Sequence, residues 1–143
     1  LFLYDGDRKD RIALTLSRTG TPSISLKGAD GRTPAGVYID EGGKPHLDII
    51  DTAAKAGLYL ALTGPGQPGF RLADTNGMVR GLFALTPENE PVLELTDAAG
   101  KLRATLGSST VKNEKSGAME KRPVSSLLLY DETGTVVFAA PKK

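Results

Sequence analysis

The sequence repeats a pattern of 23 residues, and such a repeat restricts the fold to an array of similar structural units. Taking an Asp as the reference, equivalent positions recur at intervals of 23, 23, 23, 23 and 34 residues: Asp5, Gly28, Asp51, Asp74, Asp97 and Asp131. Prolines 22, 45, 68 and 91 each lie six residues before a reference position. We therefore expect a single β-repeat domain over residues 1–143, with units at about 1–21, 22–44, 45–67, 68–90, 91–107 and 123–143 and an insertion loop at 108–122.

Apolar residues alternate with other residues inside each unit. The positions two and four residues before the reference are apolar in all six units: Leu1 and Leu3, Ile24 and Leu26, Leu47 and Ile49, Phe70 and Leu72, Leu93 and Leu95, Leu127 and Leu129. A second alternating series follows each reference position, as at Ala104 and Leu106. A period of two predicts β-strands with one buried face. Between the paired apolar positions, the middle units carry Ser25, Asp48, Arg71 and Glu94, which predicts a solvent-exposed opposite face.

The reference positions begin turn motifs. Three units carry Asp-x-x-Gly, at residues 74–77, 97–100 and 131–134, where Asp accepts a backbone N–H and Gly adopts a left-handed conformation. A tight hairpin of this kind would pair Leu95 with Arg103, whereas the apolar series continues at Ala104. Either an extra β-bulge corrects the register, or each unit is one coil of a parallel β-solenoid.

The expected fold class is therefore all-β, with about twelve strands in six tandem strand-turn-strand repeats. We favour an antiparallel hairpin meander, closed or two-layered, because the turns are typical of hairpins. The alternatives are a β-solenoid and, after it, a β-trefoil or β-prism.

Two regions depart from the repeat and are the candidate partner contacts. The two ends resemble each other: both have an apolar residue at the normally polar position, Phe2 and Leu128, followed by Tyr4 and Tyr130. Terminal repeats of an open array are usually polar, so apolar ends predict that the first and last units meet or contact other subunits. The insertion is polar, which is typical of a solvated loop; its candidate contact residues are Lys115, Met119, Lys121 and Arg122.

No catalytic or metal-binding constellation is recognisable in the sequence. His46 is the only histidine, has no nucleophile placed beside it by a known motif, and is expected to be a surface residue. The acidic stretch at residues 5–10 lacks the distal glutamate of a calcium loop. Basic residues after the turns, Arg11, Arg80 and Arg103 among them, would form a cationic ladder for an acidic polymer, but a solvated charged face is the expected outcome.

Composition narrows the class of partner. Eighteen basic and 17 acidic residues give a net charge of +1, so we expect no binding to nucleic acid. The chain has no cysteine and therefore no disulfide framework. It also has no apolar run of the roughly 20 residues that span a bilayer, so we expect no membrane insertion by this segment. Because the sequence begins inside an apparent strand, we expect a signal peptide or anchor upstream of Leu1.

The unit Leu-x-Leu-x-Asp-x-x-Gly-Lys-x-Arg-x-x-Leu, at residues 93–106, resembles tandem repeats of bacterial envelope proteins. The Tyr-Asp pairs at residues 4–5 and 130–131 are similar to the YD repeats of Rhs-type shells, in which hairpins join into a β-strip. The resemblance implies an all-β repeat outside the cytoplasm and transfers no catalytic residue.

The expected function is that of a non-catalytic structural or interaction domain. It would serve as an accessory subunit or building block of a bacterial envelope or extracellular assembly, by contact with a protein partner or by self-association, with no cofactor. The alternative is a carbohydrate-binding, lectin-like module, since about twelve strands also suit such folds.

Overall fold

The computed structural model describes residues 1–62, 66–112, 117–123 and 125–141, and these residues form strands and turns without any helix. The strands are β1 (Phe2–Tyr4), β2 (Asp10–Leu16), β3 (Pro22–Leu26), β4 (Ala35–Ile39), β5 (Pro45–Ile50), β6 (Gly57–Leu62), β7 (Pro68–Ala73), β8 (Val79–Leu85), β9 (Pro91–Thr96), β10 (Leu102–Gly107), β11 (Ser109–Lys112), β12 (Met119–Arg122), β13 (Leu127–Tyr130) and β14 (Val136–Ala140).

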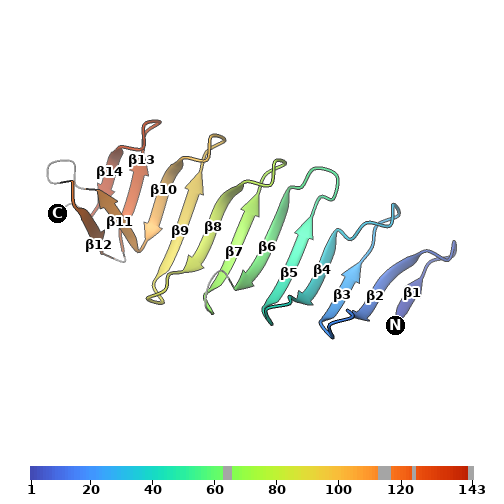
Figure 1. Ribbon diagram of the computed structural model, residues 1–143. Helices are drawn as coiled ribbons and strands as arrows, with labels where there is room; N and C mark the ends of the chain where they lie inside the picture. Colours follow the sequence, from blue (N-terminus) through green and yellow to red (C-terminus); the bar gives the residue numbers. More distant parts are fainter. Residues whose placement is uncertain (63–65, 113–116, 124, 142–143) are drawn as a thin grey trace. The chain divides into compact units, whose positions relative to one another are not determined.

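Twelve of these strands form one sheet in the order β1 to β10 followed by β13 and β14 (Figure 1). Each strand is hydrogen-bonded to the strands that precede and follow it in this order, and every register defined for the sheet is antiparallel. The predicted all-β hairpin meander is thereby confirmed. The solenoid is wrong because equivalent strands do not pair in parallel, and the trefoil and prism are wrong because the strands share one linear sheet.

The predicted closure of the array is also wrong. Strands β1 and β14 are the two end strands of the sheet order and do not pair with each other, so the first and last units do not meet through their backbones. The physical reason is that every hairpin adds its strand to the same growing edge, which leaves the first strand at the other edge.

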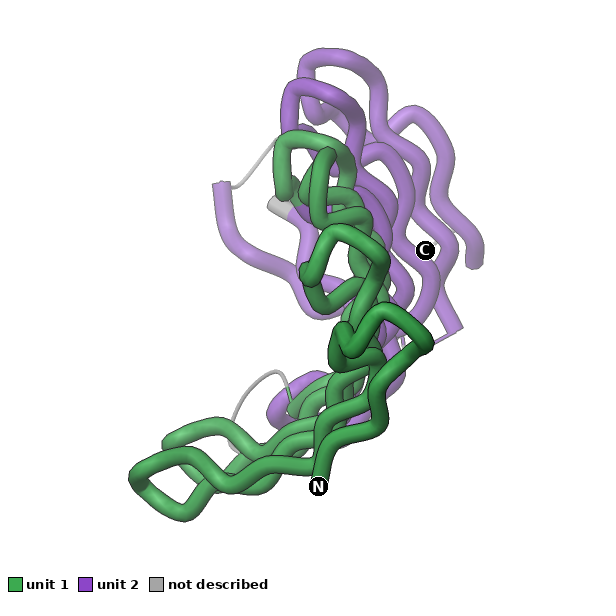
Figure 2. Tube along the Cα trace, turned by 90° about the vertical axis from the view of Figure 1, so that its right-hand side faces the viewer, with its two compact units in different colours: residues 1–62, 72–78 green, residues 63–71, 79–143 purple. Residues whose placement is uncertain are grey.

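The chain divides into two compact units, shown in separate colours in Figure 2. Unit 1 comprises Leu1–Leu62 with Leu72–Met78 and contains β1 to β6. Unit 2 comprises Thr63–Arg71 with Val79–Lys143 and contains β8 to β14, so β7 is divided between the units.

Turns of one design close hairpins at both ends of the strands. A carboxylate or hydroxyl oxygen of the first turn residue accepts backbone N–H groups two and four residues later, as Asp97 Oδ1 does from Ala99 and Lys101, both at 2.9 Å. The same pattern occurs at Ser17 and Thr86. The sequence pattern did not predict turns of this design at these two segments, although each lies 12 residues after a reference position. The 23-residue unit therefore holds two related turns.

The register problem of the Asp-x-x-Gly hairpins is solved by an extra bulge. Leu102 pairs with Thr96 but Ala104 pairs with Leu95, so Arg103 is the additional residue. Corresponding shifts occur after Asp5 and after Asp131. At Asp51 the turn itself is one residue longer, with the Asp51 N–H bonded to the Ala56 carbonyl at 2.7 Å. Both devices keep the apolar series of successive strands on one face.

The distribution of burial between the faces is the reverse of the expectation. The face that carries the alternating Leu and Ile residues is largely exposed. The buried side chains of the main sheet lie on the opposite face, which also carries polar groups: Ala13 and Ala61 in unit 1, and Ala84, Val92, Thr105 and Leu128 in unit 2. We call the face with the alternating Leu and Ile residues the leucine face, and the opposite face the mixed face. Because all main strands belong to one sheet, no second layer formed by the described residues covers the leucine face within either unit.

The sequence predicted a solvated loop for the insertion. The structure instead contains a two-stranded antiparallel sheet there, β11–β12. The chain leaves β10 at Gly107, whose φ of +106° is left-handed and whose N–H bonds to the Ser126 carbonyl at 2.9 Å. A Cβ on Gly107 would lie 2.1 Å from the Pro91 carbonyl oxygen, so only glycine fits here. Lys121 of β12 then forms an ion pair with Glu90 at 2.8 Å.

Candidate functional site

The leucine face of unit 1 is a continuous apolar surface. Strand register places its side chains in rows across β1 to β6, in which the register partners are apolar throughout: leucine, isoleucine or valine, with Pro22, Ala35 and Pro45 among them. Nine large members are between 41% and 73% exposed: Leu1, Leu3, Leu14, Leu16, Ile24, Leu26, Val37, Ile49 and Leu60. No charged residue interrupts these rows in the described strands of the unit, since the alternate positions point to the mixed face.

Unit 2 has a leucine face of the same construction. Its rows run across β8, β9, β10, β13 and β14, and six large members are at least one-third exposed: Phe83, Leu93, Leu95, Leu106, Leu129 and Phe138. The nine large members on unit 1 are aliphatic, and an aliphatic side chain of this size corresponds to roughly 60–120 Å² of apolar surface. About half exposed, they leave an apolar surface on the order of 300–500 Å² on unit 1 alone. The largest apolar patch on a typical monomer is about 300–600 Å².

The mixed face of unit 1 contains a shallow polar hollow of about 340 Å³. Its floor is made of small residues, because Ser25, Gly36 and Asp48 are direct neighbours on β3, β4 and β5. The hollow is lined by Thr15, Ser17, Thr21, Pro22, Ser23, Ile24, Ser25, Thr33, Gly36, Tyr38, Ile39, Asp48 and Ile50. Hydroxyl groups are therefore the most common polar groups around it.

Tyr38 and Asp48 form the most constrained side of the hollow. The Tyr38 hydroxyl donates to Asp48 Oδ2 at 2.9 Å, and its ring stacks on that of His46 with centroids 4.7 Å apart and planes 4° apart. Burial, followed by the hydrogen bond to Asp48, raises the pKa of Tyr38 to about 12, so the phenol stays protonated and donates at neutral pH. The other carboxylate oxygen, Asp48 Oδ1, is buried without a hydrogen-bond partner among the described residues.

His46 is more covered than the expected surface histidine, with 18% of its side chain exposed. Its Nε2 lies 3.2 Å from Asp40 Oδ2. The pKa of Asp40 is lowered because the Lys44 backbone N–H donates to it and His46 contacts it. His46 therefore supports Tyr38 from one side while Asp40 holds the imidazole.

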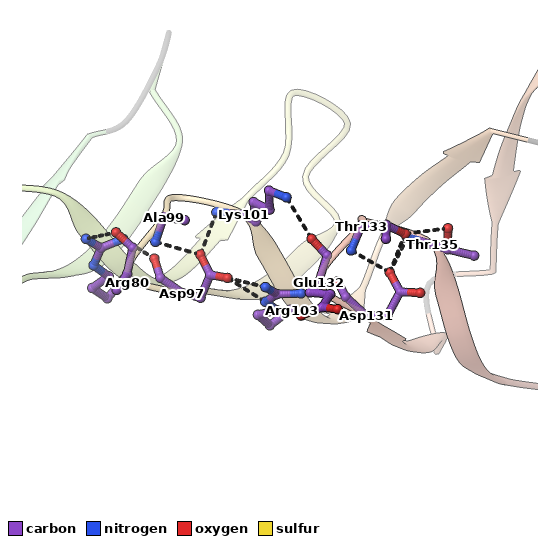
Figure 3. A network of polar contacts seen from close by, with 10 residues as sticks. Arg80, Asp97, Ala99, Lys101, Arg103, Asp131, Glu132, Thr133 and Thr135 are labelled. Atoms are coloured by element: carbon purple, nitrogen blue, oxygen red, sulfur yellow. Dashed lines mark hydrogen bonds and ion pairs between the residues drawn. The ribbon is translucent and has the colours of Figure 1, made fainter.

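The basic residues after the turns hold neighbouring turns together. Arg103, the bulge residue, donates from Nε to Asp97 Oδ2 at 2.7 Å and from Nη1 to the Asp131 carbonyl of the next turn (Figure 3). Lys101 Nζ donates to the Glu132 carbonyl at 2.7 Å, and Arg80 donates to the Asp97 carbonyl. These cations are engaged within the protein, so the ladder suggested by the sequence is a set of links between turns.

Asp5 heads a turn of the same kind. It accepts the Asp7 and Lys9 backbone N–H groups at 2.9 and 3.0 Å and a hydrogen bond from Arg11 at 2.6 Å. Its pKa is lowered by the Lys9 N–H first and by Arg11 as well. Among the described residues no group of three or more potential metal ligands occurs.

The candidate contacts at the two ends differ in environment. Phe2 is 44% exposed and Tyr4 is also exposed, whereas Leu128, the equivalent of Phe2, is fully buried at 0% and Tyr130 is half-buried. The mixed-face position is thus open in the first unit and covered in the last.

The insertion residues also divide. Met119 is exposed, Lys121 forms an ion pair with Glu90 and Arg122 is half-buried, while Lys115 lies outside the described residues.

The sequence pattern predicted the leucine face as a buried core and not as an exposed surface. The signal for a continuous face was present, because the apolar residues occupy alternate positions on the same side of all twelve strands.

No protein-family model matches this sequence, and no curated protein matches it either. Among the described residues there is also no helix that is long and apolar enough to cross a bilayer.

Proposed function

We propose that this chain is a non-catalytic structural domain that assembles with copies of itself through the leucine face, as a building block of a bacterial envelope or extracellular structure. The observation that carries the proposal is the continuous exposure of this face in each compact unit. The extracytoplasmic setting rests on the resemblance to envelope repeats.

The exposed area supports a protein as the occupant. A stable interface of standard size buries about 800 Å² on each partner. The roughly 300–500 Å² of exposed apolar side chain on unit 1 supplies about half of that area. Apolar surface removed from water stabilises a complex in proportion to its area, so a face of this size favours association.

A second copy suits the surface for three reasons. Two apolar sheet faces pack about 10 Å apart by interdigitating side chains, without unpaired charges. The face repeats the same rows from strand to strand, which makes it self-complementary and suited to a two-fold interface. The net charge of +1 produces little repulsion between copies.

The test compares two neighbouring positions on β9 that point to opposite faces. Leu95→Lys places a charge on the leucine face, and Glu94→Lys is the matched control on the mixed face. We expect the native protein and Glu94→Lys to form a defined oligomer in sedimentation velocity, and Leu95→Lys to shift toward monomer by at least tenfold in dissociation constant. Ile24→Lys tests unit 1 in the same way.

Circular dichroism is the folding control. We expect an unchanged strand signal in each variant, because the Leu95 and Ile24 side chains are already exposed in the isolated chain. A native protein that sediments as a monomer up to millimolar concentration refutes self-assembly. Equal oligomerisation of Leu95→Lys, Ile24→Lys and Glu94→Lys removes the leucine face from the interface.

A further inference from the structure

The polar hollow on the mixed face of unit 1 has the features of a binding site for a small polyhydroxyl ligand. We propose that it binds one neutral pyranose ring of a glycan. This proposal does not depend on self-assembly, because most residues that line the hollow, such as Ser25 and Asp48, belong to the mixed face. Of its lining, Pro22, Ile24 and Ile39 belong to the leucine face.

The first argument is the unpaired acceptor. Asp48 Oδ1 is buried without a hydrogen-bond partner among the described residues, while Oδ2 accepts from the Tyr38 hydroxyl. A buried polar atom without a partner has lost its hydration without gaining a hydrogen bond, which is unfavourable. An alcohol donated by a ligand removes that cost, and a carboxylate that accepts from alcohols repels anionic ligands.

The second argument is the aromatic ring. Stacking on His46 covers one side of the Tyr38 ring, and the neighbour of Tyr38 on the other side is the small residue Ser23 of β3. The second ring face is therefore left toward the hollow. An apolar ring face beside a hydrogen-bonding carboxylate suits a pyranose, which presents C–H groups on its faces and hydroxyls at its edge.

The third argument is the hydroxyl lining. The hydroxyl oxygens of Thr15 and Ser23 lie 2.7 Å apart, and either hydroxyl can donate the hydrogen bond between them. The pair can therefore adapt to a ligand hydroxyl, which both donates and accepts. Ser25 and Thr33 add further hydroxyls. The volume of about 340 Å³ is at the small end of the range for small-molecule sites, which indicates a single ring.

The test is a titration followed by ¹H–¹⁵N correlation spectra. Glucose, galactose, mannose and N-acetylglucosamine are added to the full chain, with acetate and ethylammonium as anionic and cationic probes. We expect saturable shifts from at least one sugar at the amides of Ser23, Ser25 and Tyr38, with a millimolar dissociation constant.

Two variants and one control locate the site. Ser25→Leu fills the floor of the hollow and is expected to abolish the shifts. Asp48→Asn keeps the side-chain shape and is expected to weaken binding about tenfold, as expected for loss of a charge-assisted hydrogen bond. Leu95→Lys, on the leucine face of unit 2, is expected to bind the sugar with native affinity even where it prevents assembly.

The proposal is overturned if no sugar gives saturable shifts, if only acetate or ethylammonium does, or if Ser25→Leu and Asp48→Asn both bind as the native chain does. Sugar binding by a strictly monomeric native protein leaves this proposal intact and refutes self-assembly alone.

Discussion

Arg103 is the extra residue of a β-bulge and binds two successive turns, through Asp97 Oδ2 at 2.7 Å and through the carbonyl of Asp131. Because it is the bulge residue, Arg103 has no register partner on β9, and its ion pair with Asp97 holds the guanidinium at the turn of its own hairpin. One residue thus corrects the register of a hairpin and links that hairpin to the next.

Arg103→Met should lower the melting temperature, because it removes contacts to both turns while keeping most of the aliphatic side chain. The matched control is Arg18→Met, at an exposed turn position whose side chain makes no hydrogen bond or ion pair among the described residues. Thermal unfolding followed by circular dichroism measures both. Equal melting temperatures for the two variants would show that the link contributes nothing to stability.

The turn carboxylates predict loss of stability in acid. The pKa of Asp97 is lowered by the Lys101 N–H and then by Arg103, and that of Asp131 by the Thr133 hydroxyl and the Thr135 N–H. A lowered folded-state pKa contributes stability that is present above the ordinary value of 3.8 and is lost as the pH falls through the folded value.

Urea unfolding should accordingly show little change between pH 7 and pH 5 from these groups and a decline below about pH 4. Asp97→Asn should be less stable than the native chain at pH 7 and should approach it at pH 3. A constant difference at both pH values would contradict this account.

Gly107→Ala should destabilise the protein by about 3 kcal/mol or more, because its Cβ meets the Pro91 backbone and the residue is left-handed. Gly134→Ala is the control: it has a φ of +90° but nothing within 4 Å of the new Cβ, so only the backbone cost of about 1–2 kcal/mol applies. Chemical denaturation of the two variants gives the comparison. Equal losses would mean that the approach to Pro91 is relieved by small shifts.

Arg8→Gly should stabilise the first hairpin by about 0.5–1 kcal/mol, because Arg8 occupies the left-handed turn position, with a φ of 60°, that glycine fills in the Asp-x-x-Gly turns. Asp7→Gly, one residue earlier, has no positive φ to relieve and should lower stability instead. Denaturant midpoints at constant m-value report both changes.

Thr105→Val should be neutral or stabilising by about 1 kcal/mol, because Thr105 is 1% exposed and its hydroxyl has no hydrogen-bond partner among the described residues. Thr96→Val serves as the counterpart, since the Thr96 hydroxyl donates to the Val79 carbonyl at 2.7 Å. We expect Thr96→Val to be the less stable of the two in thermal unfolding. The reverse order would show that Thr105 is paired in solution.

Local sequence patterns predicted much of the fold. The parity conflict between Leu95 and Ala104 predicted either a bulge or a solenoid coil, because side chains alternate strictly along a strand, and the structure has the bulge. The turns at Ser17 and Thr86 were missed because their first residues are hydroxyl side chains rather than Asp, although the hydrogen bonds are equivalent. The hairpin in the insertion was missed because β12 contains three polar residues and no alternating apolar pattern.

The candidate sites depended on information that the sequence does not hold. The hollow combines Ser25, Gly36 and Asp48 from three strands, and their adjacency follows from register between hairpins. Leu128 and Phe2 are equivalent in the repeat, yet one is buried and the other exposed. Their local sequences are the same in kind, so the difference comes from what packs over each.

The sequence by itself determined that residues such as Leu93 and Leu95 share one face of an antiparallel array, because strand periodicity and turn chemistry act over a few neighbouring residues. Only the tertiary structure decided that this face is open. Burial depends on a second surface to pack against, and the twelve main strands of this chain all belong to the same sheet.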